Sequence, residues 1–151
     1  MKRKRPAKKK LVLVDVENCC GTPILTAERV AKTREALLSR QVFNDGDLVI
    51  VGTSHPSNMF AAKAGWSDSR CVMKRGRNGG DLAIIEAAKS HLDNIDSFSE
   101  VVLLSGDGIF TNLVRDISLK GIRVTVASRI DSLNESLARQ ASCLSLLNCP
   151  S

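Results

Sequence analysis

The chain has 151 residues, enough for one domain with a substantial buried core. Hydrophobic residues make up 43% and charged residues 25%, as in ordinary globular proteins, and no apolar run approaches the roughly 18 residues of a membrane span. Aromatic residues make up only 3%, with no Tyr, which argues against a protein that recognises RNA bases on an aromatic platform.

The net charge of +6 is concentrated at the start of the chain. Residues 1–10 carry seven cations and no acid, so the +6 of the whole chain becomes about −1 for residues 11–151. Such a block repels itself and attracts phosphates. We therefore predict a basic disordered tail over residues 1–10 that binds nucleic acid, in particular through Lys8, Lys9 and Lys10. A solubilising tail, a remnant of cloning and a nuclear-import signal are the alternatives.

Neither secretion nor a zinc site is indicated. The apolar run of residues 11–14 ends at Asp15 and is too short for a secretion signal, which needs roughly 7–15 apolar residues. The five cysteines form no CxxC pair and have no zinc-ligand spacing with histidine. We predict reduced thiols, a cytoplasmic location and no association with membranes.

Short β-branched runs alternate with amphipathic stretches along the rest of the chain. The predicted strands are, in order, Leu11–Val14, Leu48–Val51, Arg70–Met73, Val101–Leu104 and Ile122–Ala127. The predicted helices run from a cap at Thr26 to about 40, over 57–65, over 81–92, through the stripe Phe110, Leu113, Val114 and Ile117, and from a capping box that begins at Ser132.

This alternation predicts an α/β fold. Continuously apolar strands separated by helices indicate a mainly parallel sheet covered on both faces. We expect a single-domain, Rossmann-like three-layer sandwich with five strands, over residues 11–147, followed by a short C-terminal end at 148–151. The order of the strands in the sheet is left open.

Acidic side chains follow two of these strands. Asp15 ends the first strand, and the run from Ser105 to Asp107 follows the fourth. In a doubly wound sheet, ligands bind at the carboxyl ends of the strands. Asp81 begins a helical stripe that must face the sheet, so its carboxylate is expected at the same edge. Three converging carboxylates repel one another unless a cation lies between them, and oxygen-only ligands favour Mg²⁺ or Mn²⁺.

Each of these residues also has a structural interpretation. Asp107 is a possible helix cap, and Asp81 is a favourable charge at a helix N-terminus. Asp15 needs a partner because it ends a buried strand. Asn18 is either a turn residue or a group that orients water or phosphate. We expect Glu17 to face solvent.

The remaining polar candidates are interpreted as structural. We expect His55 to be a loop hydrogen-bonding residue and His91 to lie at the surface. Cys19 and Cys20 lack a histidine at any diagnostic spacing, so neither is expected to act as a nucleophile.

A basic, glycine-containing loop precedes Asp81. It has neither the GxGxxG nor the GxxxxGK[ST] form, so a nucleotide cofactor is poorly supported. Lys74, Arg75 and Arg77 instead place cations beside the acidic pocket. A cationic rim around a metal pocket suits a phosphodiester substrate, and we predict that these three residues bind nucleic acid.

Four segments resemble the NYN domain family, a branch of the PIN-like nuclease fold. They are LVLVDVEN at 11–18, GGDLAII at 79–85, LLSGDGIF at 103–110 and KGIRVTVAS at 120–128. The similarity extends over about residues 11–145. The resemblance implies a PIN-like fold and divalent-metal-dependent hydrolysis of RNA. It also implies a metal site carried by Asp15, Asp81 and Asp107, with Asn18 nearby. We expect these three carboxylates to be catalytic, and Asn18 and Ser105 to orient water or a phosphate oxygen.

One position departs from the family pattern. The family usually has a second acid two residues after the position of Asp107, and this chain has Ile109 there. A divalent-metal-dependent endoribonuclease is the leading hypothesis. A catalytically weakened or non-catalytic RNA-binding protein is the alternative, and a homo-oligomer is possible in either case. A haloacid-dehalogenase-type phosphatase fits poorly, because it needs Asp where this chain has Glu17.

Overall fold

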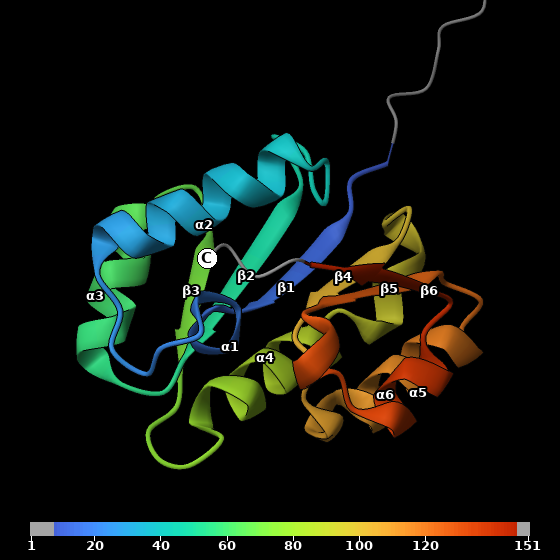
Figure 1. Ribbon diagram of the computed structural model, residues 1–151. Coiled ribbons are helices and arrows are strands. Elements are labelled where there is room, and N and C mark those ends of the chain that lie inside the picture. Colours follow the sequence, from blue (N-terminus) through green and yellow to red (C-terminus); the bar gives the residue numbers. More distant parts are fainter. Residues whose placement is uncertain (1–7, 148–151) are drawn as a thin grey trace, which may run out of the picture.

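One parallel sheet of six strands forms the centre of the protein in the computed structural model, which describes residues 8–147 (Figure 1). The strand order is β3-β2-β1-β4-β5-β6, and every neighbouring pair is parallel. The strands are β1 Leu11–Asp15, β2 Leu48–Thr53, β3 Arg70–Met73, β4 Val101–Leu104, β5 Val124–Ser128 and β6 Cys143–Leu146.

The predicted α/β sandwich is therefore confirmed, with one more strand than expected. The sequence pattern did not indicate β6, because its residues alternate between half-buried and exposed and include the exposed Leu144 and Leu146. Strand β6 pairs with β5 in parallel, in a register that runs from Thr125 opposite Cys143 to Ser128 opposite Leu146.

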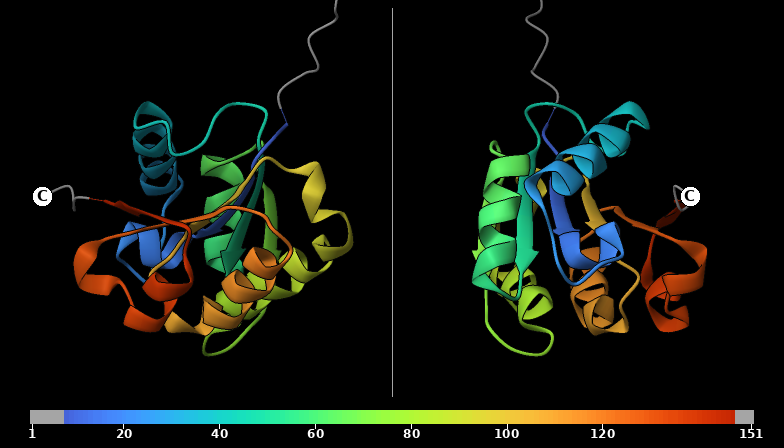
Figure 2. Two further views of the ribbon diagram at one scale, coloured as in Figure 1. Left: turned by 90° about the vertical axis from the view of Figure 1, so that its right-hand side faces the viewer. Right: turned by 60° about the vertical axis from the view of Figure 1, so that its left-hand side comes forward.

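Helices cover both faces of the sheet (Figure 2). They are α1 Val16–Cys20, α2 Ala27–Ser39, α3 Pro56–Gly65, α4 Gly79–Lys89, α5 Thr111–Leu119 and α6 Glu135–Gln140. Helices α1, α2 and α3 pack on one face of the sheet, and helices α4, α5 and α6 pack on the other. Short 3-10 segments, η1 Leu92–Ser97, η2 Gly108–Phe110 and η3 Ile130–Ser132, complete the connections.

The start predicted for the last helix was wrong. The Asn134 side chain caps α6 by accepting a hydrogen bond from the Leu137 amide at 3.1 Å, whereas Ser132 lies in η3. Asn is as good a cap as Ser, so the local pattern did not distinguish them. Helix α4 also differs from the prediction, because it begins two residues earlier, at Gly79, and continues as η1 after Lys89.

The alternating residues of the central strands belong to two separate cores. Leu11 and Leu13 of β1 pack with the α4–α6 side, whereas Val12 and Val14 pack with the α1–α3 side. All four are at most 1% exposed. Because both faces are buried, the strand reads as a continuous apolar run rather than an alternating one.

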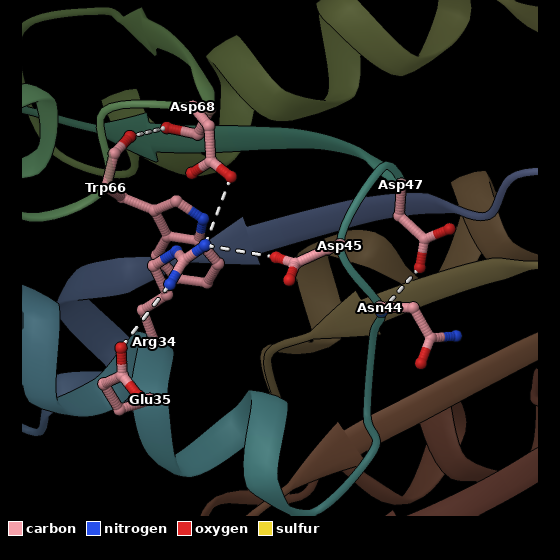
Figure 3. A network of polar contacts seen from close by, with 8 residues as sticks. Arg34, Glu35, Asn44, Asp45, Asp47, Trp66 and Asp68 are labelled. Carbon is pink, nitrogen blue, oxygen red and sulfur yellow. Dashed lines mark hydrogen bonds and ion pairs between the residues drawn. The ribbon is translucent and has the colours of Figure 1, made fainter.

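An ion-pair network connects α2 to its neighbours (Figure 3). The Arg34 guanidinium lies 3.2 Å from the Asp68 carboxylate, 3.5 Å from that of Asp45 and 3.6 Å from that of Glu35. The rings of Phe43 and Trp66 stack at a centroid distance of 5.3 Å. The Arg34 side chain is only 19% exposed, but the three carboxylates are 58–83% exposed, so each pair contributes little to stability.

Residues 8–10 contact the body of the domain. The Lys10 amide donates to Asp47 Oδ1 at 3.0 Å, and Lys10 Nζ pairs with Glu100 Oε1 at 3.0 Å. The Lys9 carbonyl accepts from the Ser99 amide at 2.9 Å. Residues 1–7 of the expected tail, and the expected C-terminal end at 148–151, lie outside the described residues. Across residues 8–147, the helices are too short or too polar to span a bilayer.

Candidate metal centre

The pairing of β1 with β4 places two polar residues side by side. Leu11–Val14 align with Val101–Leu104, so Asp15 and Ser105 leave adjacent strands at the same edge. Ser105 Oγ donates a hydrogen bond of 3.0 Å to Asp15 Oδ2. Asp15 is 6% exposed and Ser105 is fully buried. The hydroxyl therefore holds the carboxylate in one orientation, out of competition with bulk water.

Asp107 joins this edge through the same serine. Its amide donates to Ser105 Oγ at 3.2 Å, and its Oδ1 accepts from the Ile109 amide at 3.0 Å. Asp107 thus caps η2, as its structural interpretation predicted. Asp15 also acts as a cap, since its Oδ1 accepts from the Asn18 amide at 3.4 Å at the start of α1. In both carboxylates these caps use Oδ1.

Asp81 lies in the first turn of α4 and is 7% exposed. Burial, the charge of Asp15 and a hydrogen bond with Asp15 raise the pKa of Asp81 to about 8, and the charge and hydrogen bonding of Asp107 act in the same direction. Burial also raises the pKa of Asp15, although hydrogen bonds from Asp81 and Ser105 oppose that shift. The structure therefore brings the three predicted carboxylates into mutual electrostatic reach.

The donor set suits a hard, partly hydrated cation. Within residues 8–147, no group of three or more Asp, Glu, His or Cys side chains is arranged so that it could hold a metal ion. Mg²⁺ does not require three protein ligands, because it commonly binds through one or two carboxylates, retained waters and substrate phosphates. The raised pKa of Asp81 is the shift expected of a buried carboxyl group close to other carboxylates.

Glu17 was predicted to face solvent, but its carboxylate lies in a hydrogen-bond network. Its carboxylate accepts hydrogen bonds from Ser54 Oγ at 2.8 and 3.0 Å and a short one from Asn58 Nδ2. Asn58 is 2% exposed and also donates to the Pro23 carbonyl at 2.9 Å. This network joins α1 to β2 and α3, and thereby supports the loop that follows Asp15. A polar Asn on a helix face that is otherwise apolar was the sequence signal for it.

The basic residues predicted to bind nucleic acid lie on the loop between β3 and α4. Lys74, Arg75 and Arg77 are all exposed, and Lys74 Nζ lies 3.6 Å from Glu86 Oε2. The loop enters α4 tightly, since a Cβ at Gly79 would lie 1.7 Å from the Lys74 carbonyl oxygen. Only glycine fits at that position. The close contact between Gly79 and Lys74 fixes the start of α4, and with it the position of Asp81 in the first turn.

The histidines and cysteines take no part in the acidic cluster. His55 caps α3 through the Ser57 amide, as its loop interpretation predicted. His91 was expected at the surface but is half-buried, edge-on to Phe98 at 5.8 Å. Cys19 Sγ donates to the Leu104 carbonyl at 3.1 Å, and burial raises the pKa of its thiol well above the ordinary value. The four cysteines within the described residues are free thiols.

Comparison with known proteins extends over the whole domain. The family described as NYN domain matches residues 9–147. Among solved structures, a protein of unknown function from Vibrio parahaemolyticus RIMD 2210633 is similar with a TM-score of 0.63 and 21% sequence identity, over 97% of each chain. At that identity the similarity concerns the fold alone. No curated protein matches the chain.

Proposed function

The chain belongs to the NYN domain family, generally a PIN-like nuclease domain whose nucleases use divalent metals, and from this premise we propose that it is a divalent-metal-dependent endoribonuclease. The observation that carries the proposal is the convergence of Asp15, Asp81 and Asp107 at the carboxyl edge of β1 and β4. A cation there, Mg²⁺ or Mn²⁺, would activate water and stabilise charge on the scissile phosphate.

The chain's own residues prepare this site in three ways. Ser105 orients the Asp15 carboxylate and, through the Asp107 amide, the start of η2. Asp81 holds a proton near neutral pH that a bound cation would displace. Asn18 lies beside Asp15 in α1, where its side chain is proposed to position water or a phosphate oxygen.

Three aspects of the proposal extend beyond the acidic cluster. We propose RNA as the substrate, held in part by the tail residues Lys8, Lys9 and Lys10 and by Lys74, Arg75 and Arg77 of the β3–α4 loop. A cytoplasmic location is proposed on the basis of the free thiols among the described cysteines. A homo-oligomer also stays a proposal, which sedimentation of the purified protein would test.

The proposal is tested by replacing one carboxylate and one matched acid elsewhere. Asp15→Asn removes a charge from the cluster, and Asp93→Asn removes one from an exposed position in η1. Titration calorimetry with Mn²⁺ and single-turnover cleavage of a labelled RNA are measured for both. We expect Asp15→Asn to lose metal binding and cleavage, and Asp93→Asn to keep both. Full metal affinity in Asp15→Asn would contradict the proposed site.

Ile109 favours a second candidate, a non-catalytic RNA-binding protein. An apolar side chain at this position cannot bind a metal, and it packs at the edge of the core between the sheet and α4–α6. RNA binding by the wild type without cleavage of several RNAs, in Mg²⁺ and in Mn²⁺, would establish this alternative.

A further inference from the structure

A cavity of about 540 Å³ opens beside the acidic site, between α2 and the carboxyl end of β5. Asn18, whose amide is bonded to Asp15, lines one end of it. Ala127 and Leu147 contribute from the sheet, and Ala36 and Leu37 from α2. The volume is within the roughly 300–1,000 Å³ of ordinary ligand sites, so the cavity has room for a nucleotide-sized group.

The charged residues that line this cavity are all cationic. Arg29, Lys32 and Arg40 come from α2 and its C-cap, and Arg129 follows β5, whereas no Asp or Glu is among the lining residues in the described part of the chain. We call the cavity lined by these four cations the α2 groove. The surplus of positive charge favours an anionic occupant.

The three α2 cations lie along one side of the helix. Their positions are separated by three and eight residues, which return to nearly the same face of a helix of 3.6 residues per turn. At about 1.5 Å per residue, Arg29 and Arg40 are roughly 16 Å apart along the axis. A row of that length is longer than a single phosphate group and suits an extended polyanion.

A second cavity, of about 410 Å³, adjoins the first at Arg40, whose side chain lines both cavities. It runs over Val102, Thr125 and Ser145 on the sheet face that α2 flanks. Unlike the first cavity, it contains a carboxylate, because Glu100 pairs there with Lys10 at 3.0 Å and with Arg123 at 3.8 Å. Within the described residues, the lining of the α2 groove contains no carboxylate, although Lys32 pairs with the exposed Glu28 at 3.3 Å. The α2 groove is therefore the more cationic of the two cavities, and it is the one next to the acidic site.

We infer that the α2 groove binds the phosphate backbone of single-stranded RNA and leads the strand to the carboxylates at the ends of β1 and β4, an inference that rests on the proposed function. Within the described residues, no aromatic side chain lines either cavity. The groove therefore offers charge and small apolar surface but no stacking platform. Recognition through phosphates predicts strong salt dependence and little base preference.

The central experiment compares two double variants that remove the same charge. Lys32→Ala/Arg40→Ala truncates exposed cations of the groove, and Lys63→Ala/Lys120→Ala truncates exposed cations on α3 and after α5. Affinity for fluorescein-labelled oligouridine is measured by anisotropy in EDTA over a series of KCl concentrations. Thermal melting checks that each variant is folded. Because EDTA removes divalent cations, the binding result is independent of whether the wild type cleaves RNA.

Each phosphate contact contributes roughly 0.7 to the slope of log affinity against log salt for a single strand. We expect the groove variant to lower this slope by about 1.4, twice that contribution, and the control variant to leave it unchanged. An unchanged slope in the groove variant, or an equal loss in both variants, would overturn the inference.

Two competitors separate RNA from other anions. Inorganic phosphate or a mononucleotide that displaces oligouridine as effectively as unlabelled oligouridine would assign the groove to a small anion and overturn the inference. A polyglutamate peptide that binds the wild type but not the groove variant, while RNA binding is equal in the two, would assign it to an acidic protein. Displacement by unlabelled oligouridine alone supports the inference.

Discussion

Ser105 Oγ donates to Asp15 Oδ2 across the β1–β4 pair, so the residue after one strand orients the carboxylate that ends its neighbour. The same oxygen accepts from the Asp107 amide at 3.2 Å. One buried hydroxyl thus connects two of the three proposed metal ligands. This arrangement predicts that Ser105 matters for stability and for metal affinity at once.

Replacing Ser105 with Ala removes the hydroxyl that donates to the buried Asp15 carboxylate. We expect the free energy of unfolding to fall by about 1–3 kcal/mol in urea titrations, the usual effect of stranding a buried polar group. Affinity for Mn²⁺ is also expected to fall. Ser118→Ala is the control, because Ser118 Oγ is buried without a hydrogen-bond partner within the described residues and its loss should change stability by less than about 0.5 kcal/mol. Equal effects in the two variants would contradict this role.

The raised pKa of Asp81 predicts a pH dependence of stability in the metal-free protein. Between the ordinary value of 3.8 and about 8, the folded state holds a proton on Asp81 that the unfolded state has lost. Stability should therefore fall as pH rises through this window, by up to about 1.4 kcal/mol per unit from this group. Urea titrations from pH 5 to pH 8 measure it. Asp81→Asn should flatten the curve and Asp93→Asn should not.

Ile109→Asp distinguishes a weakened nuclease from a binding protein. The substitution removes an apolar side chain that packs at the edge of the core and adds a charge near Asp107, so we expect a stability loss of about 0.5–3 kcal/mol. In a weakened nuclease, single-turnover RNA cleavage with Mn²⁺ should increase. Ile109→Asn introduces a side chain that has the shape of Asp but no charge, and it should not increase RNA cleavage. Cleavage that persists in Asp15→Asn/Ile109→Asp would indicate a contaminating ribonuclease.

Two truncations separate the charge of the N-terminal segment from its structural contacts. Deleting residues 2–7 removes four cations and is expected to lower the salt slope of RNA binding by up to about 2.8, with little change in Tm. Deleting residues 2–10 also removes the contacts of Lys10 with Asp47 and Glu100, so its Tm should fall. Equal Tm values for the two truncations would show that residues 8–10 contribute nothing to stability.

The alternation of apolar runs and amphipathic stretches determined the architecture. Five of the six strands were predicted from short apolar, β-branched runs, which are continuous in β1 and β4 because these strands are buried on both faces. The positions of Asp15 and Asp107 directly after strands were equally local features. The parallel sheet then required both to appear at the same edge.

The partners of these residues were decided only by the tertiary structure. Ser105 and Asp15 are 90 residues apart, and Glu17 and Asn58 are 41 apart, so no local pattern connects them. Edge strand β6 is held by its pairing with β5 rather than by buried side chains, and the α2 groove joins a helix to a distant strand end. Periodicity records which face of an element is buried, but strand order and register decide what meets that face.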